Sequence, residues 1–524
     1  MSRSKFFNII GILFIVYIVV FIAGMTRSAF TEADVPNEYQ EVTNIQLTDS
    51  FLKGVNPYSV SVATDKDSPG LIYEYGPVYS LIVALFARII PVDIISLHYA
   101  VSLIAMLAAA VIATVLMHEN AGGILPAAAA FLFIINCTWR YGYVNAVPDA
   151  LALMLSILVL FVETRRPFKL KELTEAVLIV LIFYTKVYFV FAALPLFIYK
   201  LIKDKKAALR FFLFGAVIMG LGFIILNMTC PLLFTYMIYY IAGPIGASKT
   251  GSSGGSGWSY EILQLKSLAG IYIVMFIVTV LGMIYAFKKK ADEKNDLKLL
   301  LMINIIAAVP ALIVLGKNDG AWLSYYLQLI MPYIIMFSLI FINDMSLHSE
   351  GKAGKAAWVI LYMLMLLFTA YRSSVRLPYY YMTADQRKTW DDAYELLDEC
   401  LAKGEVYYSP VFGFHAIKHD QYIYNGLAAN PVRRYEGYNN TPWLRTLFPD
   451  AGAVMENRLE YKEKLEGRIR NGEFELITAI EGDDGTDRLI KISDVEAGPY
   501  EYIGSIDLPV SRVCYTVKLF RRAR

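Results

Sequence analysis

Charged side chains are scarce in this sequence: only 18% of its 524 residues are Asp, Glu, Lys or Arg, and the net charge is +2. A chain so close to neutral lacks the dense basic surface with which proteins hold nucleic acid, so no nucleic-acid partner is expected. Cysteine is scarce too, and the four cysteines follow no metal-binding spacing. Cys400 and Cys514 lie in the polar C-terminal part, where they would pair if that part is exported.

Apolar residues are abundant instead, at 57% of the chain with a mean hydropathy of +0.49. The first apolar run, residues 6–25, follows Arg3 and Lys5 and lacks a clear small-x-small cleavage site. We interpret it as a retained membrane span whose N-terminus is cytoplasmic. The other apolar stretches lie roughly at 72–92, 94–117, 122–143, 148–163, 172–201, 210–228, 268–287, 298–315, 322–342 and 356–374. These stretches predict a polytopic α-helical membrane protein.

The positive-inside rule orients these stretches, because basic loops stay in the cytoplasm. The basic connecting segments are 163–172, 200–210, 288–298 and 348–355. Segment 25–74 instead carries eight acidic and three basic side chains, which predicts that it is outside. An odd number of crossings must then separate segment 25–74 from segment 163–172. Stretch 72–92, which is broken at Gly76-Pro77, is therefore predicted to be an interfacial helix.

Stretch 172–201 connects two cytoplasmic segments, so it must cross an even number of times. Two short helices meeting at "YTKVY" (184–188) satisfy this condition and bring Lys186 near the outer side. The total is about eleven transmembrane helices. We predict a transmembrane domain at 1–375, with an outer loop at 25–93, and an extracytoplasmic mixed α/β domain at 376–524. In that domain, residues 457–473 are helix-like, and strand-like runs occur at 404–411, 474–480, 500–506 and 513–520.

Several charged residues fall near the predicted outer ends of the spans. They are Glu38, Glu41, Asp149, Lys186, Lys317 and Arg140. Charges at such depth are costly and usually functional. Carboxylates beside cations suit sugar transfer from a lipid phosphate, since an acid can deprotonate an acceptor hydroxyl and cations can stabilise the departing phosphate. Simpler explanations are a solvated helix face for the glutamates, helix-dipole stabilisation for Asp149 and snorkelling for Lys186.

Ordered motifs over residues 1–345 resemble the GT-C superfamily of polyprenyl-phosphate-sugar-dependent membrane glycosyltransferases. That superfamily includes protein O-mannosyltransferases and lipid A aminoarabinose transferases. The motifs are a first loop with paired acids closing on "GVNPY", then "YEYGPVYSLIVALF", "VPDALALML", a lysine at a helix break and the late "NDGAWLSYYLQLIMPYII". The resemblance implies a GT-C-like fold with its donor pocket beside that late segment.

The family carries a catalytic Asp-Glu pair in its first outer loop, where this chain has Asn37-Glu38. The resemblance therefore implies Glu38 or Glu41 as the base. It implies Asp149 as the second acid, and a donor-phosphate role for Lys186, with Lys317, Arg140 or His98 assisting. His98 stands where relatives often have Arg. Asn37 and the tyrosines flanking the Gly-Pro break, Tyr73 and Tyr75, are candidate substrate contacts, although aromatic belts also explain such tyrosines.

These observations predict an inverting glycosyltransferase with a carboxylate general base. It would pass a hexose or pentose from a polyprenyl-phosphate donor to a hydroxyl of a lipid, polysaccharide or protein acceptor. No cofactor is implied with certainty, and a divalent metal remains open because carboxylates near a phosphate can hold one. The expected location is a bacterial or archaeal plasma membrane, at its outer face. Three alternatives remain: a polysaccharide polymerase or ligase using diphosphate-linked glycan, a glycolipid transporter or flippase, and an inactive scaffolding relative.

Overall fold

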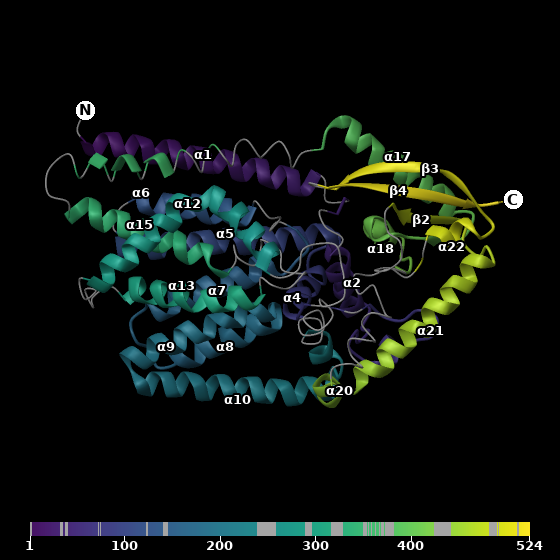
Figure 1. Ribbon diagram of the computed structural model, residues 1–524, viewed down its shortest axis with the longest axis horizontal. Helices are drawn as coiled ribbons and strands as arrows, with labels where there is room; N and C mark the ends of the chain where they lie inside the picture. The colour runs from purple at the N-terminus through teal and green to yellow at the C-terminus, as the bar shows by residue number, and fades with distance from the viewer. Residues whose placement is uncertain are drawn as a thin grey trace.

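Long helices form one end of the molecule, and a sheet with its own helices forms the other, as Figure 1 shows for this computed structural model. The structure describes residues 3–31, 35–36, 40–71, 73, 75–121, 124–139, 145–237, 258–288, 296–315, 329–348, scattered positions between 354 and 371, and 382–423, 442–481, 490, 492–510 and 513–523.

The long helices of the described chain lie side by side along one direction (Figure 1). They are α1 (Arg3–Thr31), α5 (Ile94–Ala121), α6 (Ile124–Trp139), α7 (Asp149–Glu163), α8 (Lys171–Thr185), α9 (Ala193–Lys203), α10 (Lys205–Thr229), α12 (Trp258–Lys288), α13 (Asp296–Leu315) and α15 (Met331–His348). In the described residues, three helical segments are both long and apolar enough to cross a membrane: Ile94–Ala121, Lys205–Thr229 and Asp296–Ile313. The predicted total of eleven spans remains a prediction.

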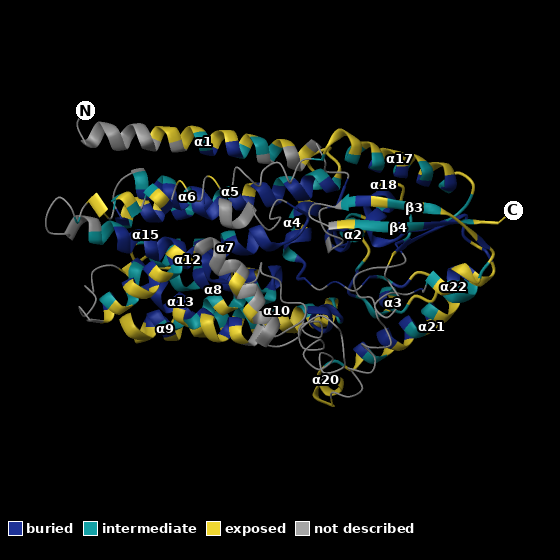
Figure 2. Ribbon diagram, turned by 45° about the horizontal axis from the view of Figure 1, so that its top comes forward, coloured by how far each residue is buried: buried dark blue, intermediate teal, exposed yellow. Residues whose placement is uncertain are grey.

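Helix α10 has the surface expected of a lipid-facing helix. Only 6% of its apolar window is buried within the protein. Large side chains such as Leu213, Val217 and Leu221 are exposed, and Figure 2 shows exposed positions running along α10. An apolar surface of this extent needs a partner other than water, and a bilayer provides one.

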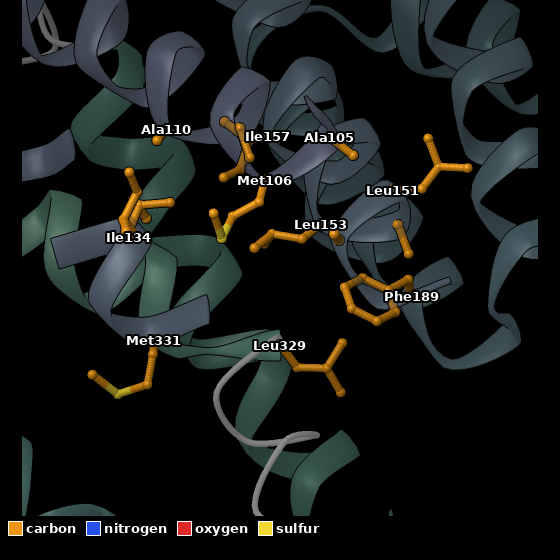
Figure 3. Packing of buried hydrophobic residues seen from close by; sticks show 14 of the residues in the cluster. Ala105, Met106, Ala110, Ile134, Leu151, Leu153, Ile157, Phe189, Leu329 and Met331 are labelled. Carbon is orange, nitrogen blue, oxygen red and sulfur yellow. The ribbon is translucent and has the colours of Figure 1, made fainter. Parts of the chain in front are cut away.

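The core of the helical part lies around α5. This helix buries Ala105, Ala109, Ala110 and Ala113, and such small side chains let neighbouring helices approach closely. Helices α6 and α7 both pack against it. Figure 3 shows part of the resulting core, with Met106, Ile134 and Leu153 from α5, α6 and α7 in the same buried cluster as Phe189.

Two local features of the apolar part agree with the sequence predictions. The only helix described in stretch 72–92 is α4 (Val78–Ala87), whose ten residues reach about 15 Å and cannot span a membrane. Helix α8 ends at Thr185, Lys186 is extended, and a 3-10 turn η1 (Val187–Ala192) leads into α9. The predicted break at Lys186 is therefore confirmed.

The C-terminal part contains a four-stranded sheet of order β1-β2-β4-β3. Its strands are β1 (Val406–Tyr407), β2 (Leu476–Ile480), β3 (Tyr500–Val510) and β4 (Val513–Arg522), and only β1 and β2 pair in parallel. Gly504 provides the positive φ of 146° at an irregularity between β3 and β4. All four strands fall within or overlap the predicted strand-like runs, which confirms a mixed α/β part.

Two helices pack on this sheet, α17 (Ala384–Leu401) and α22 (Ile492–Glu496). The other helices described in this part are α18 (Gly413–Lys418), α20 (Pro442–Leu447) and α21 (Asp450–Arg470). Helix α17 begins with a capping box formed by Thr383 and Gln386. The predicted boundary at 375/376 falls among residues outside the described ranges.

The expected pairing of Cys400 with Cys514 is wrong, since both thiols are free. Cys400 is buried on α17, where its sulfur accepts a hydrogen bond from Arg521 at 3.2 Å, whereas Cys514 is exposed on β4. The two side chains therefore lie in different environments of the same part.

Candidate functional site

Glu41 lies at the start of α2 (Gln40–Leu52), a helix of the first loop, and is completely buried. Its Oε1 accepts a hydrogen bond from the backbone N–H of Ala146 at 2.9 Å. Its Oε2 accepts one from the Tyr99 hydroxyl at 3.3 Å. A buried carboxylate needs such donors to offset the loss of water. Glu41 therefore ties the first loop to α5 and to the segment that leads into α7.

A second polar network, formed by Tyr79 of α4 and Ser102 of α5, holds the same segment. The Ser102 hydroxyl donates to the carbonyl of Asn145 at 2.6 Å, and Tyr79 Oη lies 2.9 Å from Ser102 Oγ. The Tyr79 hydroxyl also donates to the carbonyl of His98 at 2.9 Å. The same hydroxyl lies 3.3 Å from the carbonyl oxygen of Asn145, the residue before the Ala146 that Glu41 binds, so this network and Glu41 hold neighbouring residues of the segment that leads to Asp149.

Asp149 and Lys186 form a buried ion pair. Asp149 Oδ2 lies 2.7 Å from Lys186 Nζ, and the side chains are 9% and 3% exposed. Asp149 is the first residue of α7, directly after Pro148, where the helix dipole favours a negative charge. Lys186 lies at the break after α8, so the pair joins the ends of two adjacent helices.

Aromatic rings surround this lysine. The ammonium of Lys186 lies 4.9 Å from the ring centroid of Tyr75 and 5.5 Å from that of Tyr188, within cation–π range. Gly76 makes the approach of Tyr75 possible, because a Cβ added there would lie 1.9 Å from the carbonyl oxygen of Tyr184. The Gly-Pro break thus positions Tyr75 against the Lys186 turn.

The predicted His98 is also buried, but it faces α2. Its Nε2 lies 2.7 Å from Thr48 Oγ1, and its ring packs against that of Tyr79 with centroids 5.1 Å apart. Tyr73 lies in a separate aromatic group with Tyr58 and Tyr236, where the Tyr58 and Tyr73 centroids are 5.9 Å apart. The structure therefore brings Glu41, Asp149, Lys186 and Tyr75 into one region and places Tyr73 in a neighbouring core.

Four predicted site residues lie outside the described residues: Asn37, Glu38, Arg140 and Lys317. Their roles stay predictions. Metal dependence also stays open, although Glu41 and Asp149 each already have a protein donor.

Sequence reasoning missed Tyr79, Tyr99, Ser102 and Thr48. One signal was available on α2, where the buried polar residues Glu41, Asn44 and Thr48 recur at helical spacing and mark a polar stripe facing inward. The i,i+4 spacing of His98 and Ser102 similarly marks one face of α5. Nothing in the sequence indicated that these two faces would meet.

A second buried charge group lies at the opposite ends of the same helices. Lys200 on α9 contacts Glu175 Oε2 at 2.8 Å and also pairs with Glu163. Glu163 ends α7 and Glu175 is near the start of α8, whereas Asp149 starts α7 and Lys186 follows α8. This group therefore lies away from the candidate site.

The C-terminal part packs directly on the first loop. A Cβ on Gly413, the first residue of α18, would lie 2.4 Å from Val42 Cγ1, so the Gly413 backbone packs directly on the Val42 side chain, next to Glu41 in the sequence. Further along the loop, the Tyr422 hydroxyl donates to the carbonyl of Pro69 at 2.8 Å, and Asn457 donates to the carbonyl of Thr64 at 3.0 Å. The position of α2 therefore depends on both parts of the protein.

The solved structures most relevant to this arrangement are membrane enzymes. The chain is similar to ArnT from Cupriavidus metallidurans in the apo state (TM-score 0.57, 11% identity), covering 96% of this chain and 97% of that one. ArnT bound to undecaprenyl phosphate gives a TM-score of 0.54 and 11% identity over 96% and 98% of the two chains. The Archaeoglobus fulgidus oligosaccharyltransferase tethered with an acceptor peptide gives a TM-score of 0.50 and 11% identity. That match covers 94% of this chain and 72% of the oligosaccharyltransferase chain.

No protein-family model matches the chain, and no curated protein sequence matches it either. At these identities the likeness establishes the fold. The chain shares the helical fold of ArnT and of the oligosaccharyltransferase, and its described residues include a C-terminal α/β sheet part. The resemblance predicted from the ordered motifs is confirmed at this level.

Proposed function

We propose that this protein is a membrane glycosyltransferase that moves a sugar from a polyprenyl-phosphate donor to an acceptor hydroxyl at the outer membrane face. The observation that carries the proposal is the buried Asp149–Lys186 pair, next to a segment anchored by Glu41. A structural neighbour of the same fold, ArnT, has been captured with undecaprenyl phosphate, which supports a lipid phosphate as the donor's leaving group.

Lys186 would bind the donor phosphate. An ammonium at this depth is costly unless paired, and Asp149 is its partner until an anionic ligand arrives. As the sugar–phosphate bond breaks, negative charge grows on the phosphate oxygens, and a fixed cation stabilises that change. Arg140 and Lys317 are proposed as further phosphate contacts, with His98 supporting the site through its contact with Thr48 on α2.

We assign the general base to Glu38 and a positioning role to Glu41. Glu41 is fully buried and accepts hydrogen bonds from Ala146 and Tyr99, whereas a general base must reach the proton it removes. Glu38 precedes it by three residues in the same loop.

In the proposed reaction Glu38 takes the acceptor's hydroxyl proton, and that oxygen bonds to the anomeric carbon. The bond from this carbon to the phosphate oxygen breaks, with inversion. Asp149 would orient the reacting groups through Lys186.

The proposed topology has eleven spans, a cytoplasmic N-terminus and an extracytoplasmic part at 376–524. This places the site in the outer leaflet of a bacterial or archaeal plasma membrane. The C-terminal part, which packs on the first loop through α18, would then contribute to the position of the acceptor.

The test is sugar transfer by the purified full-length protein in detergent. It uses a panel of radiolabelled polyprenyl-phosphate sugars, with a membrane extract as the acceptor source. We expect Glu38→Gln and Asp149→Asn to abolish transfer, and Glu41→Gln to reduce both transfer and thermal stability. Asp392→Asn, an exposed change on α17, is the control. Full activity in Glu38→Gln would refute that base, and donor binding without transfer in wild type would favour a transporter.

A further inference from the structure

Three potential metal ligands meet in the C-terminal part, outside the proposed transfer site. His415 lies on α18, His419 follows that helix one turn later, and Asp398 lies on α17. Asp398 Oδ1 is 3.1 Å from His415 Nε2 and 3.3 Å from His419 Nε2. All three ligand atoms lie within 4.8 Å of one another.

These distances fit a tetrahedral metal ion. Ligand atoms about 2.0–2.1 Å from zinc in a tetrahedron lie about 3.3–3.4 Å from each other. Both oxygen–nitrogen distances are close to that spacing. The two histidine rings stack with centroids 4.3 Å apart and present the same nitrogen, Nε2, to the carboxylate.

The site combines a rigid buried ligand with two accessible ones. The side chain of His415 is only 4% exposed and packs against the rings of Tyr394 and Tyr408, with centroids 5.2 and 5.7 Å away. Asp398 and His419 are 55% and 40% exposed, so an ion can enter from solvent.

We propose that Asp398, His415 and His419 form a zinc-type divalent metal site with an open fourth position. Two imidazoles and a carboxylate are the ligand types that zinc favours, and three protein ligands leave a place for water or another donor. The ion would join α17 to α18. Because Gly413 of α18 contacts Val42 on α2, the joined helices would support the element that carries Glu41.

The test measures metal binding directly on the full-length protein in detergent, purified through a histidine-free tag and stripped with a chelator. Calorimetry with zinc gives stoichiometry and affinity. Visible absorption after adding cobalt reports tetrahedral coordination. We expect one zinc ion per chain, a tetrahedral cobalt spectrum and a higher thermal unfolding midpoint with zinc.

Asp398→Asn and His419→Gln are the informative variants, because both side chains are partly exposed and their replacement should leave the fold intact. Each is expected to weaken zinc binding at least tenfold and to remove the zinc-dependent stabilisation. His118→Gln, an exposed histidine on α5, and Asp392→Asn are controls that should bind like wild type. Zinc binding that is absent in wild type, or unchanged in both ligand variants, would overturn the site and leave a hydrogen-bonded triad. Since no readout depends on sugar transfer, the result is independent of the proposed function.

Discussion

Removing one member of the Asp149–Lys186 pair should damage both stability and transfer, and the expected size follows from the geometry. At 2.7 Å, an effective dielectric constant of about 20 gives an attraction of about 6 kcal/mol. Desolvation of two nearly buried charges offsets much of that attraction. Breaking such a pair from one side nevertheless costs about 3–5 kcal/mol, because the remaining charge stays buried without its partner. The free energy of unfolding should therefore fall by about 3–5 kcal/mol in Lys186→Met and by a similar amount in Asp149→Asn.

The double variant Asp149→Asn/Lys186→Met separates the structural role from the chemical one. It leaves no unpaired charge, so its thermal unfolding midpoint in detergent should return towards that of wild type. Its transfer rate should remain at least about 100-fold low, as expected when a stabilising cation is lost. Equal destabilisation in the double and single variants would refute the coupling. Recovery of transfer in the double variant would refute the role of Lys186 in phosphate stabilisation.

Lys200→Met is the matched control, because it also removes a buried, paired lysine from the same bundle. The change removes the lysine partner of Glu175, which lies at the end of α8 away from Lys186. The free energy of unfolding should fall by a similar amount. The KM for the donor should not change in the molecules that remain folded. If the donor KM rises as much in Lys200→Met as in Lys186→Met, the weaker donor binding of Lys186→Met reflects general damage to the helical bundle.

Two glycine substitutions test the close contacts around the site. Gly76→Ala places a methyl group 1.9 Å from the Tyr184 carbonyl oxygen, so the Tyr75 segment must move away from Lys186. The KM for the donor should therefore rise about tenfold or more. An unchanged donor KM in kinetic assays would contradict this reasoning. Gly413→Val drives side-chain atoms into Val42 and should lower the free energy of unfolding by about 1–3 kcal/mol and also lower kcat. Gly215→Val is the control, because an added Cβ there meets no atom within 4 Å, and it should not lower kcat.

The sequence predicted the elements on which charge and periodicity bear directly. Basic loops and crossing parity required a break within 172–201, and the structure has it at Lys186. The Gly-Pro interruption limited stretch 72–92 to a short helix, which is α4. The strands of the C-terminal part also matched alternating or β-branched runs. These features depend on local sequence, so a single chain was enough to predict them.

The contacts within the site were harder to predict, because they depend on which helix faces meet. Glu41 was a candidate catalytic base by its position, yet it is buried and bonded to the backbone of Ala146 more than a hundred residues later. His98 was a candidate phosphate ligand, yet it contacts Thr48. The Asp398–His415–His419 group joins two helices, and the i,i+4 histidine pair alone did not reveal its carboxylate. Long-range packing of this kind leaves little trace in one sequence.

The most direct test of the account is to identify the lipid released during transfer. Mass spectrometry of a reaction with purified wild-type protein should detect one polyprenyl monophosphate for each sugar transferred, and none with Glu38→Gln. Release of a polyprenyl diphosphate would contradict the proposed donor and favour a polymerase or ligase. Sugar-lipid that stays intact with every donor tested would contradict the enzyme itself.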